Sequence, residues 1–120
     1  MTKFYIEPAI LKSHPHLKIG VLVLKGVNNK SAKEEISSLV HSTTKKIQKQ
    51  YEGVNLNEIP KILDWRTAYK SFGYKPASYL SSAQSLLKRV MQGKELPDVN
   101  PIVNIYNLIS LKYTLPSGAC

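Results

Sequence analysis

The sequence predicts an α+β domain in which two or more N-terminal strands precede about four helices. A continuous β-branched and leucine run occupies residues 19–24, whereas helical spacing of apolar residues begins only after residue 31. Strands followed by helices, without regular alternation, are typical of α+β architectures and not of doubly wound sheets. The length of 120 residues and the absence of a low-complexity tract indicate one compact domain, residues 1–120.

The first strand is predicted where Phe4, Ile6 and Ile10 alternate weakly with polar residues. The second is the run IGVLVL at residues 19–24, followed by the turn-forming sequence KGVNN. A continuous apolar run of this length is typical of a strand that is buried on both faces.

The first helix is predicted from a capping box formed by Ser31 and Glu34. In this motif the hydroxyl accepts from the amide three residues on, and the glutamate side chain reaches back to the cap. Gly53 is expected to end this helix. Its apolar face consists of Ile36, Leu39, Val40, Ile47 and Tyr51, which recur at helical spacing.

A second helix is predicted over residues 57–72, with Pro60 tolerated in the first turn and Gly73 as the stop. Residues 74–80 contain Lys75-Pro76 and Ser78, which predict a surface loop.

Two further helices are predicted after this loop. Ser81 begins a short third helix through residue 90, and Gly93 closes it. Asn100, followed by a proline at the first helical position, begins a fourth helix that extends to about residue 113.

The chain is strongly basic, with 17 Lys and Arg against 8 Asp and Glu and a net charge of +9. A field of this sign attracts phosphate polyanions, so nucleic acid is the predicted partner class; the alternative is a basic protein without such a partner. Trp65 and Tyr69 are expected to pack in the core beside these cations. The predicted nucleic-acid contacts are Arg66, Lys70, Lys75, Lys88 and Arg89.

The residues alone do not indicate an enzyme. No glycine-rich phosphate loop is present, and neither His41 nor the single cysteine, Cys120, has an identifiable catalytic partner. His14 and His16 lack a third metal ligand, so no metal and no cofactor is predicted. No apolar run approaches the roughly 20 residues that span a bilayer, and a cytoplasmic location without membrane contact is expected.

Three asparagines interrupt the fourth helix, which is otherwise apolar nearly all round. Asn100, Asn104 and Asn107 fall on one stripe at helical spacing, although asparagine is a poor helix former. Their amides offer donors and acceptors that suit a pocket for an aminoacyl ester or a ribose. The alternative is that they are solvated or make structural hydrogen bonds to neighbouring loops.

From Trp65 onward the chain reads WRTAYKSFGYKP, SSAQSLLKRVMQGKELPDVNPIVNIYNLISLKY and LPSGA. This sequence resembles the tRNA-binding editing domain of the bacterial phenylalanyl-tRNA synthetase beta subunit and its free-standing relatives. The resemblance covers roughly half of the chain. It implies that residues 1–120 are the N-terminal half of such a domain, with a homodimer or a missing C-terminal half completing it.

The resemblance implies hydrolysis of the ester of mischarged tRNA, such as tyrosine on the tRNA for phenylalanine. Asn107 matches an asparagine that lines the family's pocket. Two other positions depart from the pattern. Gln84 replaces a glutamate, and Gly118 stands where the synthetase has histidine. The free-standing relatives often have glycine at the second of these positions. The implied catalytic residues are Asn107 and Gly118, and the implied substrate-binding residues are Asn100, Asn104, Pro116 and Ser117.

Asn104 also stands where the family favours aspartate, so no carboxylate is available at that position. Two alternatives to a trans-editing enzyme therefore stay open. The chain is then either a non-catalytic RNA-binding module or an incomplete fragment of the editing domain.

Overall fold

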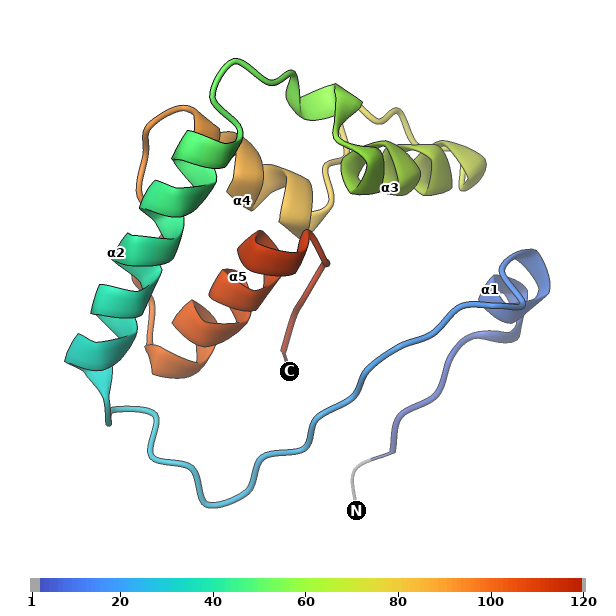
Figure 1. The fold of residues 1–120 in the computed structure, drawn as a ribbon. Coiled ribbons are helices and arrows are strands. Elements are labelled where there is room, and N and C mark those ends of the chain that lie inside the picture. The colour runs from blue at the N-terminus through green and yellow to red at the C-terminus, as the bar shows by residue number, and fades with distance from the viewer. Residues whose placement is uncertain (1–2, 120) are drawn as a thin grey trace.

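The computed structural model describes residues 3–119, and its regular structure is helical (Figure 1). Between residues 3 and 119 no residue belongs to a β-strand, so the predicted α+β class is wrong. The elements are α1 (Pro8–Ser13), α2 (Lys33–Gln50), the 3-10 turn η1 (Leu56–Glu58), α3 (Pro60–Ser71), α4 (Ser82–Met91) and α5 (Pro101–Tyr113).

The two predicted strands fail for different reasons. Pro8 occupies the first helical position of α1, so part of the weakly alternating segment is helical. Residues 19–24 belong to no regular element, because a strand needs a hydrogen-bonded neighbour, and the part of the chain described here provides none.

We call residues 3–32 the N-terminal arm. Two contacts join the arm to the rest of the described chain: the rings of His14 and Phe72 lie 5.1 Å apart, and the Ile102 amide donates to Asn29 Oδ1 at 2.8 Å. Between these contacts the arm runs apart from the helices (Figure 1). Its predicted buried run is exposed instead, with Leu22 81% accessible.

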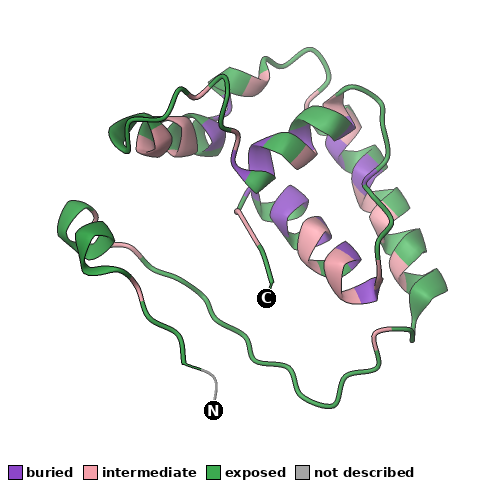
Figure 2. Cartoon of the chain, turned by 180° about the vertical axis from the view of Figure 1, so that it is seen from behind, coloured by how far each residue is buried: buried purple, intermediate pink, exposed green. Residues whose placement is uncertain are grey.

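We call residues 33–119 the helical body. Helices α2, α4 and α5 pack together, and η1 leads from them to α3 (Figure 1). Buried positions lie on α2, α4 and α5, whereas the arm is exposed along most of its length (Figure 2). The hydrophobic core of the body consists of Ile47, Ile59, Ile62, Leu87, Val90, Leu96 and Leu111.

The predicted starts of the last two helices are confirmed. Ser81 Oγ accepts from the Gln84 amide at 3.2 Å, and Asn100 Oδ1 accepts from the Val103 amide at 3.0 Å. Each bond satisfies an amide that has no partner within its own helix. Gly93 lies two residues beyond the last residue of α4 and has a φ of 81°, so it closes this helix as expected.

The other helix starts differ from their predictions. The Ser31 hydroxyl donates back to the Asn28 carbonyl at 3.0 Å, and Ala32, in the left-handed region with a φ of 56°, precedes α2. The capping box therefore does not form. The predicted helix over 57–72 is divided, because Ile59 is extended and separates η1 from α3.

The arm widens the molecule. The radius of gyration is 15.9 Å, compared with about 14 Å for a compact domain of this length. Within residues 3–119, every helix is too short or too polar to cross a membrane.

Candidate functional site

Two of the three stripe asparagines hold the segment that leads into α5. Asn100 caps the helix, and Asn104, only 8% exposed, accepts from the Val99 amide at 3.1 Å. Asn104 Nδ2 also donates to Asp98 Oδ1 at 2.9 Å. These contacts are the structural hydrogen bonds that the sequence left open as an alternative. A substrate-binding role for Asn100 and Asn104 stays a prediction.

Asn107 differs from these two. Its side chain is half-buried on α5 and makes no hydrogen bond within residues 3–119. One turn further along, Ser110 is 1% exposed and its hydroxyl has no partner in the described chain. This part of α5 therefore carries polar groups that the described residues leave free.

The turn after α5 is held by the N-terminal end of α4. Ser82 Oγ accepts from the Ser117 amide at 3.2 Å and donates to the Ser117 carbonyl at 3.4 Å. Pro116 and Ser117 are half-buried, whereas Gly118 is exposed. Among the described residues no hydrogen bond joins this turn to Asn107.

The predicted nucleic-acid contacts fall into two groups. The first lies on α3 and its loop, where half-buried Arg66 donates to the Pro76 carbonyl at 3.5 Å and Lys70 and Lys75 are exposed. Trp65 and Tyr69 are half-buried beside them, with rings edge to face at 6.5 Å, which indicates packing.

The second group lies in the last turn of α4. Lys88 and Arg89 are both exposed, and Arg89 Nε donates to the Glu95 carbonyl. Cys120 lies outside the described residues. Within residues 3–119, no three His, Asp, Glu or Cys side chains gather where they could hold a metal ion.

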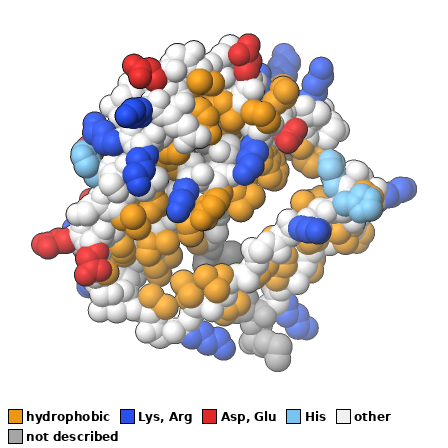
Figure 3. Space-filling model, viewed as in Figure 1, with side chains coloured by type: hydrophobic (Ala, Val, Ile, Leu, Met, Phe, Trp, Pro, Cys, Tyr) orange, Lys and Arg blue, Asp and Glu red, His pale blue; other side chains and the backbone are white. Residues whose placement is uncertain are grey.

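A cavity of about 360 Å³ lies where the ends of α2 and α5 meet the start of α3. Lys61 and Lys112 line it together with Tyr51 and Tyr113, and Lys61 Nζ donates to the Tyr113 carbonyl at 2.9 Å. Lysine and arginine side chains also gather over the upper half of α2 (Figure 3). The predicted set of nucleic-acid contacts contained neither Lys61 nor Lys112.

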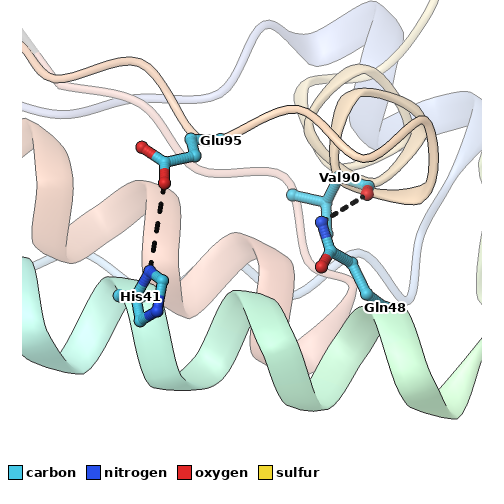
Figure 4. Close-up of polar contacts among 4 residues, drawn as sticks. All are labelled: His41, Gln48, Val90 and Glu95. Atoms are coloured by element: carbon cyan, nitrogen blue, oxygen red, sulfur yellow. Dashed lines mark hydrogen bonds and ion pairs between the residues drawn. The ribbon is translucent and has the colours of Figure 1, made fainter.

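A second cavity, of about 190 Å³, lies between α2 and the segment that joins α4 to α5. We call it the α2 groove. Two contacts bridge it (Figure 4): Gln48 Nε2 donates to the Val90 carbonyl at 3.1 Å, and His41 Nδ1 lies 3.9 Å from Glu95 Oε1. The lining residues are Ser37, Val40, His41, Thr44, Lys45, Gln48, Gly93, Glu95, Leu96, Pro97, Asp98 and Asn104.

Thr44 lies on α2 one turn from each bridging residue and lines the groove. It is 3% exposed, and its hydroxyl has no hydrogen-bond partner in the described chain. The sequence contained a signal for it, because Thr44 interrupts the apolar face between Val40 and Ile47. That signal does not reveal the opposite wall, which is contributed by residues 93–98.

Comparison with known protein families gives a match in the second part of the chain. Residues 64–120, just under half of the sequence, match the family model of the B3/4 domain. This domain is found in the editing region of the phenylalanyl-tRNA synthetase beta subunit. The resemblance predicted from Trp65 onward is therefore confirmed. No curated protein and no solved structure matches the chain.

Proposed function

We propose that this chain binds tRNA and hydrolyses the ester of a mischarged amino acid, such as tyrosine on the tRNA for phenylalanine. The B3/4 match over residues 64–120 carries the proposal, because it includes α4, α5 and the turn that follows. The net charge of +9 supports a polyanionic substrate.

Asn107 is the residue best suited to the ester. An amide that is half-buried and free of hydrogen bonds within residues 3–119 can donate to the oxygen on which negative charge develops. Water would be the nucleophile. The turn at Pro116, Ser117 and Gly118 would orient the ester, and its attachment to Ser82 limits its movement.

The direct test is release of tyrosine from tyrosyl-tRNA for phenylalanine by the whole chain, with the phenylalanyl species as control. N107A is expected to lower the rate roughly 100-fold, the order found when one oxyanion donor is removed. The matched control is N57A, because Asn57 is exposed in η1, away from α5. Equal rates for N107A and N57A would remove Asn107 from the site.

Gly118 offers a gain-of-function test. A Cβ at this position meets no atom within 4 Å, and the φ of Gly118 lies outside the left-handed region. G118H therefore fits without strain and supplies the histidine that the synthetase version carries there. Faster deacylation by G118H, with unchanged selectivity for tyrosine, is expected if this turn faces the ester. A rate equal to that of the native chain would remove Gly118 from the site.

The second candidate function is RNA binding without hydrolysis. It is favoured by the side chains of Asn100 and Asn104, which are engaged in hydrogen bonds within the chain. Affinity for tRNA should then fall steeply between low and physiological salt while no ester is cleaved. Replacing both Lys70 and Lys75 with alanine should reduce the salt slope by about two.

A further inference from the structure

The cavity at the ends of α2 and α5 is lined by two lysines, and none of its described lining residues is acidic. We call this space, of about 360 Å³, the lysine cavity. Lys61 comes from the first turn of α3, and Lys112 comes from the last turn of α5. Within residues 3–119 neither lysine forms an ion pair. Two cations that line one space without a carboxylate give it a positive potential, which attracts an anion.

Both ammonium groups lie against Tyr113. Lys61 Nζ donates to the Tyr113 carbonyl at 2.9 Å, and Lys112 Nζ lies 5.4 Å from the centre of the Tyr113 ring. Neutralisation of the carboxyl-terminal end of α5 accounts for part of this arrangement. An ammonium group has three donors, however, and Lys61 uses one of them here, whereas Lys112 makes no hydrogen bond within residues 3–119. Most of the donors of the two lysines are therefore free for a ligand.

Thr114 adds a hydroxyl to the lysine cavity from a backbone conformation that threonine seldom adopts. It follows α5 in the left-handed region, with a φ of 51° and a ψ of 49°, where glycine is the usual residue. Thr114 lines the cavity and is 7% exposed. Its hydroxyl makes no hydrogen bond within residues 3–119, yet it is not fully enclosed as those of Thr44 and Ser110 are. Strained residues of this kind are concentrated at ligand sites.

The start of α3 adds a backbone donor at the same cavity. Ile59 and Pro60 line the cavity, and no side chain caps the helix. The Lys61 amide accordingly has no acceptor within residues 3–119. The amino-terminal end of a helix favours negative charge, and here it acts beside two lysines and a free hydroxyl.

We propose that the lysine cavity binds the phosphate group of a nucleotide. A phosphate presents several oxygens, which suit donors that reach one cavity from α3, from α5 and from the residue after α5. The cavity is larger than a phosphate alone, and the rings of Tyr51 and Tyr113 line the remainder. Aromatic rings stack on every base, so the site selects the phosphate and not a particular base. As a contact for RNA it rests on the proposed tRNA binding, whereas as a site for a free nucleotide it does not.

The test is a titration of the full chain with inorganic phosphate, adenosine 5′-monophosphate and a short oligoadenylate, followed through backbone amide resonances. Shifts should concentrate in residues 59–61 and 112–114, and the monophosphate should bind more tightly than inorganic phosphate. Tighter binding of the oligoadenylate than of the monophosphate assigns the site to RNA, and equal binding assigns it to a free nucleotide. Shifts that avoid these residues, or no gain from inorganic phosphate to the nucleotide, would overturn the proposal.

K112M removes one of the two cations at nearly constant side-chain length. It should weaken binding of adenosine monophosphate at least about tenfold, because a charge-assisted hydrogen bond is lost. The matched control is K94M, because Lys94 is exposed and lines neither cavity. If Lys112 only neutralised the end of α5, K112M would lower the melting temperature and leave the affinity unchanged. That result would overturn the site.

T114A and T114S isolate the hydroxyl of Thr114. Both variants lose the γ-methyl group and retain a Cβ in the left-handed region, so they should melt at similar temperatures, and only T114S keeps the hydroxyl. T114A should bind adenosine monophosphate roughly tenfold more weakly than T114S. Equal affinities would overturn the site. Phosphate-induced shifts in a chain that releases no tyrosine from tRNA would support this site while the proposed hydrolysis fails.

Discussion

The N-terminal arm and the helical body both carry large apolar side chains, yet only the body buries them. Leu87 on α4 is 1% exposed, whereas Leu22 in the arm is 81% exposed. A helix satisfies its backbone hydrogen bonds internally and needs neighbours only for its apolar face. An extended run needs a neighbour for both its backbone and its side chains, and the described chain offers the arm none.

The difference shows which part of the chain has stability of its own. The body is held by core side chains from four helices, whereas a ring contact at His14 and a hydrogen bond at Asn29 join the arm to it. Residues 19–24 are therefore expected to gain order only when a partner pairs with them.

Amide hydrogen exchange should give the largest contrast between the two regions. Core amides of α4 and α5 open only with global unfolding, which costs about 5–15 kcal/mol in domains of this kind. Amides of residues 19–24 belong to no helix or strand and should exchange at nearly the unstructured rate. Strong protection of residues 19–24 in the isolated chain would contradict this distinction.

A pair of identical substitutions gives the next largest effect. L87A removes a core side chain and should lower the free energy of unfolding by about 2–5 kcal/mol, whereas L22A should change it by less than about 0.5 kcal/mol. Urea unfolding of both variants measures the difference. A comparable loss in L22A would mean that the arm is packed in solution.

The sequence predicted the parts of the fold that are decided locally. Ser81 and Asn100 cap their helices through bonds within three residues, and such contacts can be read from spacing. The strand prediction for residues 19–24 failed because strand pairing depends on residues that are far away in the sequence. The Ser31 capping box failed because α2 begins at Lys33 with Ala32 as its N-cap, while the Ser31 hydroxyl donates to the Asn28 carbonyl.

The candidate sites also divide into a part that the local sequence predicts and a part that depends on distant residues. The resemblance to the family from Trp65 onward could be recognised in the sequence, and residues 64–120 match the B3/4 domain. The α2 groove was not predicted because Thr44 and Asp98 are far apart in sequence and only the packing of α2 brings them to one cavity. Thr44 within an apolar face was the one local sign of it.

Removal of the hydrogen bond between arm and body should have a smaller effect. N29A deletes the acceptor for the Ile102 amide and should cost about 1 kcal/mol, with the amide resonance of Ile102 shifting. N28A is the matched control, because Asn28 Oδ1 accepts only locally, from the Lys30 amide. An unchanged Ile102 resonance in N29A would show that the arm is not attached there.

The smallest effect on stability, and the sharpest test of the arm, is expected from L22K. The new charge lies in solvent, so the free energy of unfolding should change by less than about 0.5 kcal/mol. Exposed apolar runs with unpaired backbone promote association, and a lysine in such a run opposes it. Sedimentation at increasing concentration should therefore show weaker self-association for L22K than for the native chain. Equal association would place any contact between copies on the helical body, and the arm would then act only as a mobile extension.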